Sequence, residues 1–205
     1  MIDGFPVRNP RSLVRRQASV TLVEPRPLRG ELKLGTALET FRIDVAGRTA
    51  LDVGAAAGGF TSALLKQGAC KVYAVDAGFG QLRGSLRQDP RVVNLERINL
   101  GALDRQVVPE QIALITIDVS YVALARAVPQ LERVEIARGA DLVALVKPMF
   151  ELGVGSSPLK QSELDSALER AVTGVQRVGW RVLGSFESPI AGARGATEFW
   201  LHARF

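Results

Sequence analysis

Cysteine and histidine are almost absent from this sequence, which contains only Cys70 and His202. A single cysteine excludes a disulfide framework within the chain, and the scarcity of both residues excludes a zinc site with the usual ligands. We therefore expect no bound metal. The cysteine content is also consistent with a reducing compartment, and we expect the protein in the cytoplasm.

Long hydrophobic runs are absent as well. No apolar stretch reaches the ~18 residues that a membrane helix requires. The opening residues, MIDGFPVRNPRSLVRR, lack the hydrophobic core of a secretory signal. We expect no membrane partner.

Lysine is scarce although positive charge is not. Only five of the 26 cationic side chains are lysines, namely Lys33, Lys66, Lys71, Lys147 and Lys160. An amine can lose its proton when it is buried, whereas a guanidinium effectively cannot. In a chain that otherwise prefers arginine, the lysines are therefore candidates for proton transfer.

The positive charge is concentrated at one end. The net charge is +5, and residues 1–30 supply +4 of it, with six arginines against Asp3 and Glu24. This asymmetry favours a polyanionic partner, nucleic acid before membrane, although a basic soluble surface would show the same composition.

Short apolar segments alternate with helical ones from residue 31 onward. The expected strands are 49–53, 71–75, 91–95, 112–118 and 140–146, followed by two close strands in WRVLGSFES and ATEFWLHARF. The expected helices begin at 31 and cover 59–67, 80–87, 121–134 and 161–177. This order predicts an α/β fold with a mostly parallel seven-stranded sheet, helices on both faces and an antiparallel hairpin at the end.

Two further segments have expectations of their own. Residues 1–24 look separate from the rest, with a short strand over 18–24. The glycine- and serine-rich residues 151–160 are expected to form a flexible loop after the fifth strand.

The segment ALDVGAAAGGFTS, residues 50–62, joins a strand to a helix through glycines. Its pattern, D-x-G-x-x-x-G-G, departs from the dinucleotide fingerprint and fits a nucleoside ligand without a pyrophosphate better. Asp76 ends the next strand, where an acid can hold the two ribose hydroxyls. Asp52, before the turn, favours a sulfonium ligand whose amino-acid part carries an ammonium. Asn99 is either a contact to adenine or a plain turn residue.

Several motifs together resemble one enzyme family. In chain order they are RGELKLGTAL, LDVGAAAGGFTSALLKQGA, VYAVDAGFGQL, DPRVVNLERINL, ITIDVSYVAL, LVALVKPMFELG and SPIAGARGATEFWLH. This combination resembles the TlyA-type branch of the FtsJ ribose 2′-O-methyltransferases over residues 28–203. The resemblance implies a Rossmann-like fold, S-adenosylmethionine as cofactor and ribosomal RNA as substrate.

The resemblance also implies site residues. The family's lysine–aspartate–lysine–glutamate set falls on Lys33, Asp118, Lys147 and Glu198. Lys147 would accept the proton of the ribose hydroxyl, Asp118 would orient it, and the other two would position the ribose. The residues expected at the cofactor are Asp52, Gly54, Ala55, Gly58, Gly59, Phe60, Asp76, Asn99 and Asp118.

Each of these residues also has a structural interpretation. Asp118 can cap a helix, Lys33 can be a solvated helix residue and Phe60 can belong to the core.

The resemblance divides the chain into residues 1–27, a basic remnant of an S4-like RNA-binding domain, and residues 28–205, the methyltransferase domain. The alternatives for function are an NAD(P)-dependent oxidoreductase and a non-catalytic RNA-binding or haemolysin-like protein.

Overall fold

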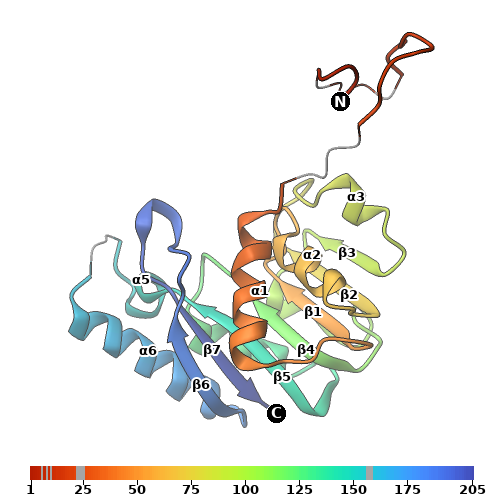
Figure 1. Cartoon of the computed structure of the whole chain (residues 1–205). Coiled ribbons are helices and arrows are strands. Elements are labelled where there is room, and N and C mark those ends of the chain that lie inside the picture. The colour runs from red at the N-terminus through yellow and green to blue at the C-terminus, as the bar shows by residue number, and fades with distance from the viewer. Residues whose placement is uncertain (6, 8, 10, 22–25, 156–158) are drawn as a thin grey trace.

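A single seven-stranded sheet organises the chain in a computed structural model, which describes residues 1–5, 7, 9, 11–21, 26–155 and 159–205 (Figure 1). The strands are β1 (Thr49–Val53), β2 (Lys71–Asp76), β3 (Val92–Glu96), β4 (Ile112–Ile117), β5 (Ile136–Val146), β6 (Arg181–Glu187) and β7 (Phe199–Arg204). Their order is β3-β2-β1-β4-β5-β7-β6, and β7 runs antiparallel to both of its neighbours. The expected fold class is confirmed, including the antiparallel pair at the end.

Helices cover both faces of the sheet. The α-helices are α1 (Arg29–Phe41), α2 (Gly59–Lys66), α3 (Gly84–Arg87), α4 (Leu124–Ala127), α5 (Pro148–Leu152) and α6 (Gln161–Gln176). The 3₁₀ helices are η1 (Leu100–Ala102), η2 (Val128–Leu131) and η3 (Ala193–Gly195). Helices α1 and α2 pack on one face, and α4, η2 and α6 pack on the other.

The central strand β1 shows why both faces are covered. Leu51 and Val53 pack among the residues under α4 and α6, whereas Ala50 packs under α1 and α2. Successive side chains of a strand point to opposite faces, so a strand buried on both sides has a nearly continuous apolar sequence.

Two expected helices are shorter in the structure. Only Leu124–Leu131 of the predicted helix 121–134 is helical, because Ala123 is extended and Pro129 supports only a 3₁₀ turn. Only Gly84–Arg87 of the predicted helix 80–87 is helical. Gly80 has φ +73°, and the Glu96 carboxylate accepts the backbone N–H groups of the residues that follow it.

The expected loop over 151–160 was partly wrong, because α5 includes Glu151 and Leu152. Pro148 occupies the first position of α5, and Gly153 ends it in the left-handed conformation. Residues 156–158 lie outside the described residues, as do residues 22–24 of the expected strand over 18–24. None of the described helices is long and apolar enough to cross a membrane.

Candidate functional site

The candidate site lies where the strand order reverses. β1 and β4 are neighbours, but the chain passes outward through β2 and β3 before it returns to β4. In open α/β sheets the loops diverge at such a point, and ligands bind in the crevice at the carboxyl ends of the strands. Two cavities open at this edge of the sheet.

The first cavity, which we call the β1–β4 pocket, has a volume of about 240 Å³. Gly54, Asp76, Ile98, Asp118 and Tyr121 form part of its wall. Apolar side chains and backbone make up most of this wall, and two carboxylates supply the charge. Such a wall suits a planar apolar group that carries a few hydroxyls.

Gly54 brings the end of β1 close to the end of β4. Its φ is +87°, and a Cβ atom there would lie 2.3 Å from the backbone oxygen of Asp118. The N–H groups of Gly54 and Ala55 both donate to the carbonyl of Val75, at 2.9 and 3.0 Å. The side chain of any larger residue at position 54 would collide with the backbone of Asp118.

Asp76 is held rigidly at the edge of the pocket. Its Oδ2 accepts the N–H of Ala56 at 2.8 Å, and its Oδ1 accepts the N–H of Gly78 at 2.6 Å. Each carboxylate oxygen can accept more than one hydrogen bond. The side chain therefore keeps acceptor capacity for hydroxyl groups in the pocket.

Asp52 lies behind the pocket rather than in its wall. The side chain is fully buried, and its oxygens accept the hydroxyls of Thr61 at 2.6 Å and Thr116 at 3.1 Å. Burial raises the pKa of this carboxyl to about 7, although the two threonine hydrogen bonds oppose the shift. In this structure Asp52 joins α2 to β1 and β4, so it supports the glycine turn from beneath.

Most of the other residues expected at the cofactor lie outside the pocket wall. Gly58 is the N-cap of α2, and a Cβ there would collide with Leu82 and Leu86. Gly59 touches α1, since a Cβ on it would lie 2.9 Å from Cα of Gly30.

Phe60 packs against Trp200 in the core, with ring centroids 5.6 Å apart. Ala55 is buried, and the exposed Asn99 stands between two residues of the pocket wall, Ile98 and Leu100. The structure thus places Phe60 in the core and leaves Asn99 at the rim.

The second cavity, the lysine cleft, has a volume of about 370 Å³ and contains all four residues of the expected catalytic set. Lys147 Nζ lies 2.6 Å from Asp118 Oδ1 and donates to the hydroxyl of Ser120 at 2.5 Å. Lys33 Nζ lies 2.5 Å from Glu198 Oε2, and both of these side chains are buried. Two ion pairs therefore line one cavity.

The surrounding elements explain how each side chain reaches the cleft. Lys147 follows β5 directly and is extended (φ −111°, ψ 102°), as expected for a residue before proline. Lys33 lies on the buried face of α1, and Glu198 immediately precedes β7. Gly192 leaves room for Glu198, because a Cβ at position 192 would lie 2.4 Å from Glu198 Oε1.

The two cavities share a wall. Asp118 and Ser120, which follow β4, line both the β1–β4 pocket and the lysine cleft. A group bound in the pocket would therefore meet a group bound in the cleft beside Asp118 and Lys147.

Two residues of the cleft were missed by the sequence analysis. Ser120 stands two positions after Asp118, a spacing that puts both on one side of an extended chain. Arg29 stands four positions before Lys33, on the same side of α1. Its guanidinium donates to the carbonyl of Gly192 at 2.9 Å and also to that of Ala191, which ties α1 to the loop before β7.

Comparison with known proteins places this geometry in a family. The model of the FtsJ-like methyltransferase family matches residues 27–205. The 16S/23S rRNA (cytidine-2′-O)-methyltransferase TlyA of Mycobacterium tuberculosis is 42% identical over 99% of this chain and 79% of its own length. Hemolysin A of Brachyspira hyodysenteriae is 34% identical over 83% of this chain and 73% of its own length.

Solved structures agree with this assignment. A hemolysin-like protein from Lactococcus lactis superimposes with a TM-score of 0.82 and 33% identity, over 86% of this chain and 87% of the other. These similarities do not favour an NAD(P)-dependent oxidoreductase. With its switch-point pocket, its two paired lysines and a family match that spans the whole sheet, the chain belongs to the FtsJ-like methyltransferase family.

Proposed function

We propose that this protein methylates the 2′-hydroxyl of a ribose in ribosomal RNA, with S-adenosylmethionine as the methyl donor. The observation that carries the proposal is the shared wall, since Asp118 and Ser120 separate a nucleoside-sized pocket from a cleft with two lysine–carboxylate pairs. The printed name of the M. tuberculosis relative supports the choice of RNA and of the ribose oxygen.

The β1–β4 pocket has the features that S-adenosylmethionine requires. Asp76 offers acceptors for the two ribose hydroxyls, and Ile98 and Leu100 offer apolar surface for adenine. Gly54 allows the ligand to approach the backbone closely, and Asp118 lies on the side that faces the cleft. When bound, S-adenosylmethionine supplies a methyl group on a positively charged sulfur.

Lys147 is proposed to accept the proton of the attacking hydroxyl. A ribose hydroxyl is a weak nucleophile at neutral pH, so the site must remove its proton and aim its oxygen. Asp118 and Ser120 contact Nζ of Lys147 and would hold it in one orientation. Lys33 and Glu198, across the cleft, would position the ribose through hydrogen bonds.

The division of the chain is part of the proposal. Residues 28–205 would form the methyltransferase domain, and residues 1–27 would serve as a basic segment that contacts RNA. The experiment below compares free RNA with intact ribosomal subunits as the substrate.

The test is transfer of tritiated methyl groups from S-adenosylmethionine to extracted ribosomal RNA, to each ribosomal subunit and to whole ribosomes, followed by mapping of the modified ribose. We expect incorporation at a 2′-oxygen, and we expect Lys147→Ala to abolish it. Lys66→Ala, which removes an exposed lysine outside the cleft, is the matched control and should retain activity. Absence of incorporation into any RNA, or full activity of Lys147→Ala, would contradict the proposal.

A further inference from the structure

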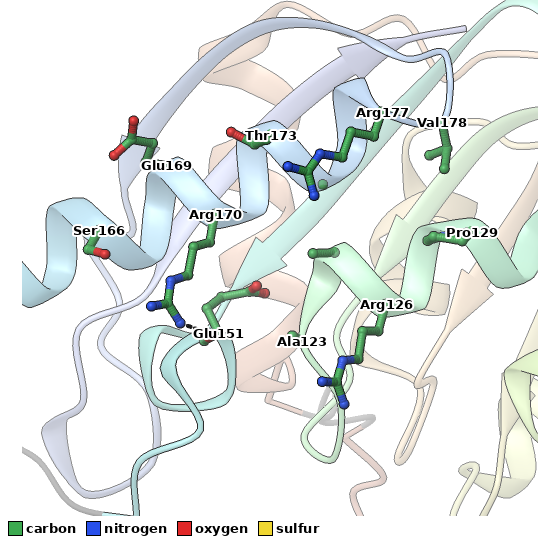
Figure 2. A pocket seen from close by; sticks show the side chains of 12 residues that line it. Ala123, Arg126, Pro129, Glu151, Ser166, Glu169, Arg170, Thr173, Arg177 and Val178 are labelled. Carbon is green, nitrogen blue, oxygen red and sulfur yellow. Dashed lines mark hydrogen bonds between the residues drawn. The ribbon is translucent and has the colours of Figure 1, made fainter.

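A third cavity lies between α6 and α4, away from the two cavities of the site, and has a volume of about 620 Å³. Figure 2 shows three arginines around it: Arg170 from α6, Arg177 directly after the end of α6, and Arg126 from α4. Arg170 and Arg177 are seven residues apart, which is about two helical turns, and the backbone of Arg177 is still helical, so both side chains leave the same side of the helix. We call this cavity the arginine groove.

The floor of the groove is made possible by a small residue. A Cβ on Gly174 would lie 2.3 Å from Cβ of Ala125, so α6 and α4 touch at this position. Only glycine allows so close an approach, and the contact fixes the spacing of the arginines above it. The groove is therefore built by packing between two helices and does not depend on a loop.

The arginines are available to a ligand. All three side chains are exposed, and none of them forms an ion pair within the part of the chain that the structure describes. Arg170 makes one long hydrogen bond, from Nη1 to the carbonyl of Glu151 at 3.4 Å. Guanidinium groups present paired donors that match the oxygens of a phosphate.

Two acids also line the groove. Glu169 is exposed and faces solvent beside Arg170. Glu151 is buried, and its carboxyl lies between the two helices in Figure 2. Its Oε1 accepts the N–H of Leu124 at 2.5 Å, whereas its Oε2 has no hydrogen-bond partner among the described residues. Burial raises the pKa of Glu151, which reduces its negative charge at moderately acidic pH. Three cations thus face one exposed acid and one buried acid.

Another cavity lies between the arginine groove and the lysine cleft. A smaller cavity of about 400 Å³ contains Arg126, Glu151 and Arg170 together with Met149 and Phe150. Met149 and Phe150 also line the lysine cleft. The three cavities therefore follow one another along the surface, from the lysine cleft past α5 to the arginine groove.

We infer that the arginine groove binds the phosphates of the RNA strand beside the nucleotide held in the lysine cleft. This inference rests on the proposed function, because it takes the cleft as the place of the acceptor ribose. Phosphate contacts of this kind set the position of a nucleic acid and contribute affinity that falls with salt, whatever the sequence. The three arginines would hold the strand in register while the cleft holds one ribose.

The test compares two double variants that remove the same charge. Arg126→Ala/Arg177→Ala removes two arginines of the groove that form no side-chain hydrogen bond with the described residues. Arg138→Ala/Arg181→Ala removes two exposed arginines near the start of β5 and of β6, neither of which lines the groove. Binding of a fluorescein-labelled RNA hairpin of mixed sequence is measured by anisotropy over a range of salt concentrations, and binding of S-adenosylmethionine is measured by calorimetry.

We expect the groove variant to bind the hairpin roughly tenfold more weakly at low salt. The slope of log Kd against log salt should fall by about 1.4–1.8, since each phosphate contact contributes about 0.7 on a single strand and about 0.9 on a duplex. Affinity for S-adenosylmethionine should stay unchanged, and the control variant should resemble the wild type more closely than the groove variant does.

Equal behaviour of the two double variants would overturn the inference. So would unchanged binding of the hairpin together with reduced methylation of intact ribosomal subunits, because the groove would then contact a ribosomal protein. These results differ from failure of the proposed function itself, in which the wild-type chain transfers no methyl group to any RNA.

Discussion

Replacing Glu198 by alanine tests how the buried ion pair of the cleft supports the fold. The side chains of Lys33 and Glu198 are each only 8% exposed. Removing one partner leaves an uncompensated buried charge, which typically lowers the free energy of unfolding by about 3–5 kcal/mol. A domain of this size loses about 2–3 kcal/mol per molar urea, so the midpoint of urea unfolding should fall by about 1–2 M.

A double variant separates stability from function. Lys33→Met/Glu198→Leu replaces the pair by apolar side chains of similar volume, which is often neutral for stability. We expect its midpoint to lie within about 0.5 M of the wild type, while methyl transfer stays lost because the ribose-positioning groups are gone.

The pair Lys66–Glu31, in which the lysine is exposed, provides the control. The Lys66 side chain is 66% exposed, so Lys66→Ala should cost less than about 1 kcal/mol. Urea unfolding followed by circular dichroism measures all of these variants. A loss of less than about 1 kcal/mol in Glu198→Ala, or a double variant as unstable as Glu198→Ala, would refute the reasoning.

Two further predictions concern single residues. The pKa of Asp52 is raised from 3.8 to about 7 in the folded state, so the folded protein binds more protons than the unfolded chain between these values and stability falls as pH rises from about 4 to 7. Asp52→Asn should remove this dependence on pH, and at pH 8 it should be more stable than the wild type by up to about 4 kcal/mol. Urea unfolding at pH 5 and pH 8 measures both proteins. If the substitution leaves the pH dependence of stability unchanged, Asp52 is ionised in the folded protein. Lys147→Arg keeps the positive charge but cannot accept a proton, so kcat should fall by about 10²–10⁴ while the Kd for S-adenosylmethionine stays the same. A Lys147→Arg variant that retains more than a tenth of the wild-type activity would exclude Lys147 as the proton acceptor.

Much of the fold could be predicted because its signals are local. The apolar segments at 49–53, 71–76 and 112–117 are nearly continuous, and the helices between them require parallel strands covered on both faces. The boundaries that failed depended on contacts from elsewhere in the chain. The N–H of Leu124, which begins α4, bonds to the side chain of Glu151, and the residues before α3 bond to Glu96.

The candidate site was predicted as a set of residues but not as a geometry. Motif order singled out Lys33, Asp118, Lys147 and Glu198, and the structure lines one cleft with all four. The burial of Asp52 behind the pocket was not visible in the glycine-turn pattern. A motif reports only the order of residue types. The direction of the Asp52 side chain depends on helix α2, because Thr61 of that helix donates a hydrogen bond to it.

The sequence by itself determined the alternation of strands and helices, the chemical types at the carboxyl ends of the strands and the scarcity of lysine. Tertiary structure alone decided that Lys33 would pair with Glu198, 165 positions away, and that arginines of α4 and α6 would flank one groove. The physical reason is that hydrophobic periodicity acts over one or two turns of chain. Ion pairs and grooves arise only when distant elements pack at a defined spacing, such as the contact between Gly174 and Ala125.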